Sequence, residues 1–290
     1  MADSSDFQPL DPQYVEARRV LLDALFALAP HEDAIIVVGA QAVYLRTGDT
    51  DIAVAPFTSD SDLALDPSLL RDDPTIEDAL RGATFQLVED PAGGAKPGSW
   101  VTTAKIEGRE HIVPLDLLVP EALSPGEGRR GARLGPHGKR AARKVRGLEA
   151  VVVDNDTMTI SALDSDDPRS IDVKVAGPAA LLIAKAYKIA ERVASGNPNR
   201  YTDKDAADVL RLMQSTDPAE AAVTMTRLGN DDVVQESVRL GLDYLRDLFG
   251  GRAGAGVAMA HRALREAMPE DRITVICTTY IEQLFAAIDL

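Results

Sequence analysis

The amino-acid sequence predicts an α+β fold, with a mixed sheet and flanking helices in the N-terminal half and a helical C-terminal half. Apolar segments of strand length, bounded by glycine, proline and polar turns, are confined to residues 1–176. From Pro178 onward, apolar residues recur at helical spacing almost to the end of the chain. We therefore expect a sheet-containing domain over residues 1–176 and a helical domain over residues 177–290.

Each element of the N-terminal half has its own pattern. A helix is expected over about 11–28, then a buried strand that ends at Gly39 and a short helix up to about 47. Pro114 cannot donate to a sheet ladder, so its strand is expected at an edge or bulged. The remaining expectations are an acidic strand around 58–65, a helix over 75–80, strands over 85–88, 100–106 and 111–119, and a hairpin over 151–160.

The C-terminal half is expected to be almost wholly helical. Glycine and proline punctuate its apolar pattern, as they do between helices. The predicted helices cover about 179–194, 203–214, 218–228, 231–248, 254–267 and 272–287.

Composition and charge limit the class of protein. With 290 residues, 45% of them hydrophobic, the chain can bury a core large enough for two subdomains. Its single cysteine, Cys277, excludes an intramolecular disulfide, so we expect a cytoplasmic protein. The first residues resemble no secretion leader and no segment has the length of a membrane span, so no membrane association is expected. We also expect a monomer.

Two carboxylates, Asp60 and Asp62, lie at positions i and i+2 where an apolar strand begins. Alternate residues of a strand point to the same side, so both side chains are expected to project together. Their repulsion is relieved when a hard cation such as Mg²⁺ binds between them with a substrate phosphate. In a chain with 46 acidic residues, a turn or a solvated face is the alternative explanation.

A third carboxylate, Asp116, interrupts the apolar strand over 111–119, where an unpaired charge is costly. A divalent cation shared with Asp60 and Asp62 would neutralise it. Upstream, a strand ends at Gly39 and a helix follows directly, which presents free backbone N–H groups to an anion such as a triphosphate. Together these features predict phosphoryl or nucleotidyl transfer.

Lys185 follows a continuous apolar segment, so its ammonium group needs either solvent or a negative partner. A triphosphate would be such a partner, and an ordinary exposed lysine is the alternative. Asp205 is expected to orient Lys185 or a substrate hydroxyl, although capping of its own helix explains this residue equally well. Asp208, one turn later, needs no role beyond exposure to solvent.

One segment is strongly basic in a chain whose net charge of −15 argues against nonspecific coating of nucleic acid. It is either a solvated, partly disordered loop or a clamp for an RNA backbone beside the active site. Its basic residues are Arg129, Arg130, Arg133, Lys139, Arg140, Arg143, Lys144 and Arg146.

Several motifs in order along the chain resemble those of the AbiEii and mycobacterial MenT nucleotidyltransferase toxins. The residues that carry the resemblance are Gly39, Thr58-x-Asp60-x-Asp62, Lys185 with Arg192, and Lys204-Asp205-Ala-Ala-Asp208. The resemblance covers about residues 33–212 and implies a DNA polymerase β-like nucleotidyltransferase fold, Mg²⁺ or Mn²⁺, a nucleoside triphosphate donor and a cognate antitoxin protein. MenT toxins modify the 3′ acceptor end of tRNA, so the resemblance implies tRNA as the acceptor RNA.

The resemblance completes the expected site. Metal binding is expected from Asp60, Asp62 and Asp116, with Lys185 and Asp205 as further catalytic residues. The family usually has Gly-Gly or Gly-Ser where this chain has Gly39-Ala40, so Gln41 or backbone amides are expected to contact the phosphates. The expected nucleotide-binding residues are Gly39, Gln41, Thr58, Ser59 and Lys185.

Two other functions remain open at this point. One is a small-molecule nucleotidyltransferase of the antibiotic-modifying type, for which the basic segment is superfluous. The other is a non-catalytic binding protein whose acidic helical half docks a partner.

Overall fold

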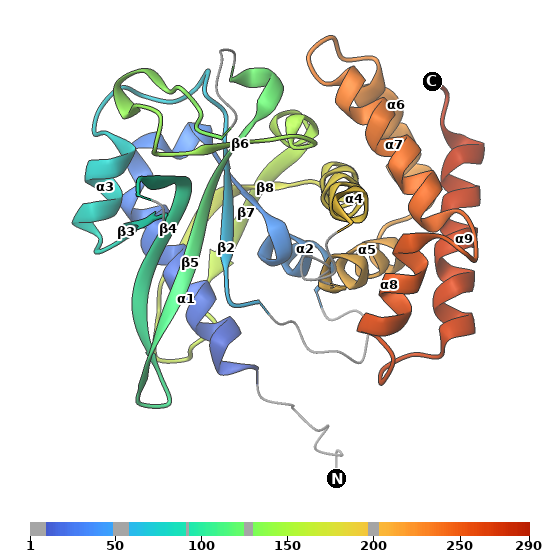
Figure 1. Ribbon diagram of the computed structural model, residues 1–290, viewed down its shortest axis with the longest axis horizontal. Coiled ribbons are helices and arrows are strands. Elements are labelled where there is room, and N and C mark those ends of the chain that lie inside the picture. Colours follow the sequence, from blue (N-terminus) through green and yellow to red (C-terminus); the bar gives the residue numbers. More distant parts are fainter. Residues whose placement is uncertain (1–9, 49–57, 91–92, 125–129, 197–202) are drawn as a thin grey trace.

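A computed structural model describes residues 10–48, 58–90, 93–124, 130–196 and 203–290. The described residues form one mixed sheet of eight strands, all before residue 177, followed by helices only. Figure 1 shows the sheet on one side of the molecule and helices α5 to α9 on the other. The predicted α+β class is confirmed, and the predicted boundary after residue 176 falls between β8 and α4.

The sheet mixes parallel and antiparallel pairs. Its order is β3-β4-β5-β2-β1-β8-β7, with β6 paired to β5. The β1–β8, β2–β5 and β5–β6 pairs are parallel, and the other pairs are antiparallel. The strands are β1 (Ile35–Val38), β2 (Ser61–Leu65), β3 (Gln86–Glu89), β4 (Ala95–Ile106), β5 (Arg109–Pro120), β6 (Arg143–Val145), β7 (Asn155–Ser161) and β8 (Ser170–Ala176).

Strand β5 changes neighbours half-way along its length. On one edge β4 pairs with it up to Asp116 and β6 pairs with it beyond, while on the other edge β2 joins only from Leu115. Pro114 precedes the part of β5 that has partners on both edges, so its predicted edge position holds only for the first half of the strand. Gly98, with a φ of 71°, permits the exchange, because an added Cβ would lie 2.4 Å from the Leu117 carbonyl oxygen.

Three α-helices accompany the described strands. The first, α1 (Pro12–Ala27), packs against β2, β4, β5 and β8, and its N-cap Asp11 accepts a hydrogen bond from the N–H of Gln13. Figure 1 shows α2 (Gly39–Thr47) between the sheet and helices α4 and α5. The third is α3 (Ile76–Gly82).

The helices of the C-terminal half match the six predicted segments, with ends shifted by up to four residues. They are α4 (Pro178–Ser195), α5 (Lys204–Ser215), α6 (Pro218–Gly229), α7 (Gln235–Phe249), α8 (Ala255–Ala263) and α9 (Glu270–Ala287). In the described part of the chain, none of the helices has the length and apolar character needed to cross a membrane. Cys277 is fully buried in α9.

The predicted hairpin over 151–160 is wrong. Residues Glu149–Val152 form a short 3₁₀ helix, and β7 pairs with β8 instead. The carboxylate of Asp154, expected in the turn, accepts a hydrogen bond of 2.8 Å from the N–H of Ala180 in the first turn of α4. A carboxylate at a helix N-terminus is favourable, and this contact ties the 3₁₀ segment to α4.

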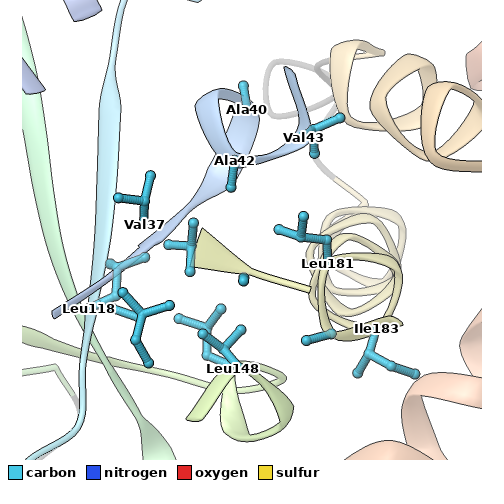
Figure 2. Close-up of a cluster of buried hydrophobic side chains, with 14 of the residues drawn as sticks. Val37, Ala40, Ala42, Val43, Leu118, Leu148, Leu181 and Ile183 are labelled. Carbon is cyan, nitrogen blue, oxygen red and sulfur yellow. The ribbon is translucent and has the colours of Figure 1, made fainter. Parts of the chain in front are cut away.

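A cluster of buried apolar side chains joins the sheet to α4. Figure 2 shows Val37 of β1, Leu118 of β5, Leu148 and Leu181 of α4 turned toward one another. All four side chains are at most 6% exposed. Close packing of this kind fixes the ends of β1 and β5 relative to α4.

Two histidines are buried beside α3. The rings of His31 and His137 meet edge to face, with centroids 5.3 Å apart. His137 Nδ1 accepts from the N–H of Ile76 (3.1 Å), so its Nε2 carries the proton and donates to the Arg71 carbonyl oxygen (2.8 Å). His31 Nε2 lies 2.8 Å from the carbonyl oxygen of Pro74, and burial lowers the pKa of His31.

We expect mild acid to destabilise the fold through His31. Because its pKa is lower in the folded state than the unfolded value of about 6.5, the unfolded chain binds more protons, and the free energy of unfolding falls as pH drops below about 6.5. Thermal melting between about pH 8 and pH 5 should show a smaller fall in midpoint for His31→Gln than for the unaltered protein. His111→Gln, on β5 and not buried, should keep the full dependence. Identical profiles for both variants would contradict this account.

Candidate active site

Three carboxylates meet where β1, β2 and β5 lie side by side. Asp62 of β2 is paired in register with Asp116 of the parallel strand β5, so their side chains are neighbours on one face. Asp60 lies two residues before Asp62, directly before β2, and borders the same cavity. The structure thus brings together the three carboxylates singled out in the sequence.

These carboxylates line a cavity of about 390 Å³ together with cationic side chains. The three aspartates come from β2, from the residue directly before it and from β5, whereas the cations come from β6, from the residue directly after it and from α4. Leu118, Leu148 and Leu181, part of the cluster in Figure 2, give the cavity an apolar surface. The cationic residues are Arg143, Arg146, Lys185, Lys188 and Arg192.

Gly39 begins α2 and packs directly on the Asp62 carboxylate. Its φ of 72° lies in the region that favours glycine, and an added Cβ would lie 2.1 Å from Asp62 Oδ2. The pairing of Val38 with Asp62 brings the end of β1 to this point. Gly39 therefore leaves room for the carboxylate, in addition to opening the N-terminus of α2 toward the cavity that it lines.

Asp60 is held by a hydroxyl and an ammonium group. Its Oδ1 accepts a hydrogen bond from the Thr58 hydroxyl and lies 3.7 Å from Lys204 Nζ, which also donates to Thr58 Oγ1 (2.9 Å). Burial opposes ionisation of Asp60, but Thr58 and Lys204 outweigh it and lower the pKa of Asp60. Thr58 is completely buried and does not line the cavity, so it positions Asp60, and its predicted nucleotide contact is wrong.

Asp62 has no such support. No hydrogen bond or ion pair from the described residues holds its carboxylate. Burial raises the pKa of Asp62 to about 6, and repulsion by Asp60 and Asp116 adds to this effect, while Lys188 opposes it. Of the three carboxylates, Asp62 therefore gains most from a bound cation.

Both carboxylate oxygens of Asp116 accept hydrogen bonds. Arg143 Nη2 donates to Oδ2 at 2.6 Å, and Ser99 Oγ donates to Oδ1 at 3.0 Å. Ser99 reaches this position because β4 pairs it directly with Asp116. The sequence led us to expect that a shared metal ion neutralises the Asp116 carboxylate. In the structure, Arg143 of β6 balances this negative charge.

The donor set fits a hard divalent cation, because it offers carboxylate oxygens in one cavity and neither thiolate nor imidazole. The unpaired and repelled carboxylate of Asp62 is where such an ion is most needed. Over the described ranges, no three His, Cys, Asp or Glu side chains are grouped closely enough to hold a metal ion as they stand. Asp60 and Asp62 are therefore the residues that would hold Mg²⁺ or Mn²⁺ at first.

Lys185 is buried and paired within the protein. Its Nζ, on a side chain 5% exposed, donates to Asp205 Oδ1 (2.9 Å) and Asp208 Oδ2 (2.6 Å). Lys188 Nζ lies 3.3 Å from Asp205, which also pairs with Arg192. Burial alone would lower the pKa of Lys185, but the two carboxylates outweigh it and raise that pKa. Burial likewise opposes ionisation of Asp205, yet Lys185, Lys188 and Arg192 lower its pKa.

These contacts bear on three predictions. The Lys185 ammonium is paired with two buried carboxylates rather than left open for a phosphate, although its side chain borders the cavity. Lys188, 46% exposed on the same helix, is the more accessible of the two lysines. Asp205 contacts Lys185, as expected, whereas Thr202, the residue expected to cap the helix together with it, lies outside the described residues. Asp208, expected in solvent, is 2% exposed.

The predicted phosphate contact of Gln41 is also wrong. Gln41 is 1% exposed and does not line the cavity. Its Oε1 accepts from Arg18 Nε (2.8 Å), and its Nε2 donates to Ser61 Oγ (2.8 Å) and the Ala17 carbonyl oxygen (3.1 Å). The amide thus joins α1, α2 and β2. Ser59 is exposed and lies outside the cavity lining, so its predicted nucleotide contact is not formed by this arrangement.

The basic segment is packed into the fold over residues 130–146, so the prediction of a partly disordered loop is wrong there. Its apolar residues are buried between the cations, and β6 lies within it. Those buried residues are Ala132, Leu134, Ala141 and Ala142.

The cations of this segment lie in two places, so the predicted RNA clamp is divided. Arg143 and Arg146 line the cavity, whereas Lys139 and Arg140 border a separate hollow at α3, where Arg140 pairs with Glu77 (3.3 Å). The remaining cations line neither place: Arg130 and Arg133 are exposed, Lys144 is half-buried in β6, and Arg129 lies outside the described residues.

Sequence reasoning missed Lys188 and Ser99. Lys185, Lys188 and Arg192 are spaced i, i+3 and i+7, which places them on one helical face, so the position of Lys188 was available from spacing alone. The contact of Ser99 depends on the register of β4 against β5, which no local pattern reveals.

Comparison with known protein families, with curated proteins and with solved structures finds no match to this chain. The fold and the cavity define a kind of site nonetheless. Carboxylates on adjacent strands face cationic side chains of a helix, an arrangement suited to a polyanion bound together with a hard cation.

We expect Gly39→Ala to displace the Asp62 carboxylate and to lower the free energy of unfolding by about 1–3 kcal/mol. The matched control is Gly48→Ala at the other end of α2, where φ is 52° but an added Cβ meets no atom within 4 Å. Urea denaturation of both variants separates the clash with Asp62 from backbone strain. Equal losses of stability would show that Asp62 does not constrain this position.

Replacing Lys185 by Met should remove the cation paired with the buried carboxylate of Asp208 and one of the cations paired with Asp205, at a cost of about 3–5 kcal/mol. Lys188→Met, one turn away at an exposed position, should cost less than about 1 kcal/mol. Chemical denaturation measures both. If Lys185→Met were as stable as Lys188→Met, the buried ion cluster would have no structural role.

Proposed function

We propose that this protein is a divalent-cation-dependent nucleotidyltransferase that transfers a nucleoside monophosphate from a nucleoside triphosphate to an RNA acceptor. The observation that carries the proposal is the single cavity in which Asp60, Asp62 and Asp116 face the cations of α4 and β6. Three neighbouring carboxylates favour a bound cation, and the cationic wall favours a bound anion. A triphosphate with its divalent cation satisfies both.

The resemblance to the AbiEii and MenT toxins supports the same proposal. Most of the residues that carry it, among them Gly39, Asp60, Asp62, Lys185 and Asp205, come from distant parts of the chain yet border the main cavity or the small hollow beside it. On this basis we propose a cytoplasmic, monomeric toxin with a cognate antitoxin protein as its partner. The 3′ acceptor end of tRNA is the acceptor that the resemblance implies.

The chemistry is an in-line displacement at phosphorus. An acceptor hydroxyl oxygen forms a bond to the α-phosphorus, the bond from that phosphorus to its β-bridging oxygen breaks, and pyrophosphate leaves while the hydroxyl proton passes to water. A bound Mg²⁺ or Mn²⁺ would supply Lewis-acid polarisation of the phosphoryl oxygens. Asp60 and Asp62 would hold this cation, with Asp116 available as a third ligand.

The cations on the opposite wall have two tasks in this proposal. Lys188 and Arg192 on α4 would neutralise the charge that develops on the departing pyrophosphate. The buried pairing of Lys185 with Asp205 and Asp208 would keep α4 in place while this happens. Arg143 and Arg146 at the cavity would contact the phosphates of the acceptor RNA.

We expect the protein to label RNA when incubated with Mg²⁺ or Mn²⁺, total RNA and at least one of the four α-labelled triphosphates, and to lose this activity in EDTA. Asp62→Asn should reduce transfer at least about 100-fold, because the carboxylate most in need of the cation is lost. Asp66→Asn, just past the far end of β2 and outside this cavity, is the matched control and should retain activity.

Three outcomes would contradict the proposal. Undiminished transfer by Asp62→Asn would remove the assigned site. Label transferred only to small-molecule acceptors would favour the antibiotic-modifying type, and no transfer with any of the four triphosphates would favour a non-catalytic binding protein.

A further inference from the structure

Arg143 forms an ion pair with Asp116, the third carboxylate of the candidate site. Its Nη2 lies 2.6 Å from Asp116 Oδ2, and the two side chains are 40% and 29% exposed. The backbone of Arg143 is fixed by two neighbours, because it pairs with Leu118 of β5 and forms a bridge with Gly131. The side chain therefore extends from a rigid strand into the cavity.

The guanidinium is incompletely satisfied in this position. Its Nε is buried and has no hydrogen-bond partner among the described residues, while Nη2 is committed to Asp116. A planar guanidinium usually binds a carboxylate or a phosphate through two parallel hydrogen bonds. The Asp116 contact uses one, because Ser99 donates to the other carboxylate oxygen.

A divalent cation shared by all three carboxylates has to compete with this arginine. Asp60 and Asp62 face the same cavity, and no arginine among the described residues pairs with either carboxylate, whereas both Asp116 oxygens already accept hydrogen bonds. An oxygen that accepts from a guanidinium 2.6 Å away has little room for a metal ion.

We infer that Arg143 holds Asp116 away from the divalent cation in the free protein and exchanges Asp116 for a phosphate group of the substrate when the site fills. The inference rests on the proposed function and adds a residue that couples the binding of metal and substrate. A single guanidinium with two alternative anionic partners makes the two binding events favour each other, because the phosphate that draws Arg143 away frees Asp116 for the metal.

Arg146 provides a matched control. It lines the same cavity three residues later, but its partner is Glu121 at 3.3 Å, which does not line the cavity. Substitution by Gln removes the same charge from the same cavity at either position. A difference between the two variants therefore reports the contact with Asp116 rather than the general electrostatic field.

The test measures the binding of Mn²⁺ to the full chain by electron paramagnetic resonance, in the absence of nucleotide and RNA. Arg143→Gln should lower the Mn²⁺ dissociation constant at least about fivefold, whereas Arg146→Gln should lower it less than about twofold. Arg143→Lys, which keeps the charge but cannot reproduce the planar fork, should fall between the unaltered protein and Arg143→Gln. If Arg143→Gln does not fold, the comparison of Arg143→Lys with the unaltered protein tests the inference in its place.

The Asp62→Asn variant distinguishes a failure of the proposed function from a failure of this inference alone. If Mn²⁺ binding does not depend on Asp62, the metal site and the proposed function fail together with this inference. If binding depends on Asp62 but Arg143→Gln and Arg143→Lys bind no more tightly than Arg146→Gln, the inference alone is overturned.

Discussion

Repulsion among three aspartates is the constraint on which the rest of the site depends. The parallel pairing of β2 with β5 sets Asp62 beside Asp116, and Asp60, directly before β2, borders the same cavity. Each carboxylate meets this constraint differently. Asp60 is stabilised by Thr58 and Lys204, Asp116 by Arg143 and Ser99, and Asp62 is half-buried with a raised pKa.

A second set of charges is neutralised by ion pairs inside the protein. Lys185, Asp205 and Asp208 are all buried and connect α4 to α5, and such a cluster is tolerable only because every charge has a close partner. Lys188 and Arg192 lie on the face of α4 that carries Lys185 and border the same cavity, but their side chains are more exposed than that of Lys185. One face of α4 thus provides both the buried ion pairs that connect α4 to α5 and the cations that are accessible to a ligand.

The parts of this structure that could be predicted from sequence are those fixed by local spacing. The C-terminal helices follow from apolar residues at helical intervals, and the i, i+2 spacing of Asp60 and Asp62 predicted that they would meet, as they do at one cavity, although Asp60 lies directly before the strand. The wrong predictions concern residues whose partners are distant in sequence. Gln41 is drawn inward by Arg18, 23 residues away, and Asp154 by the N–H of Ala180. Thr58 and Lys185 have correct neighbourhoods, but their hydrogen bonds depend on Lys204 and Asp208.

The burial of Cys277 in α9 makes this side chain a natural reporter of opening in the helical half. Burial raises the pKa of the Cys277 thiol to about 12, so the thiolate that reacts with disulfide reagents is scarce in the closed structure. Because the chain has one cysteine, every labelling event arises at this position. The rate of thiol modification under native conditions therefore measures how often α9 separates from its neighbours, with no engineered probe.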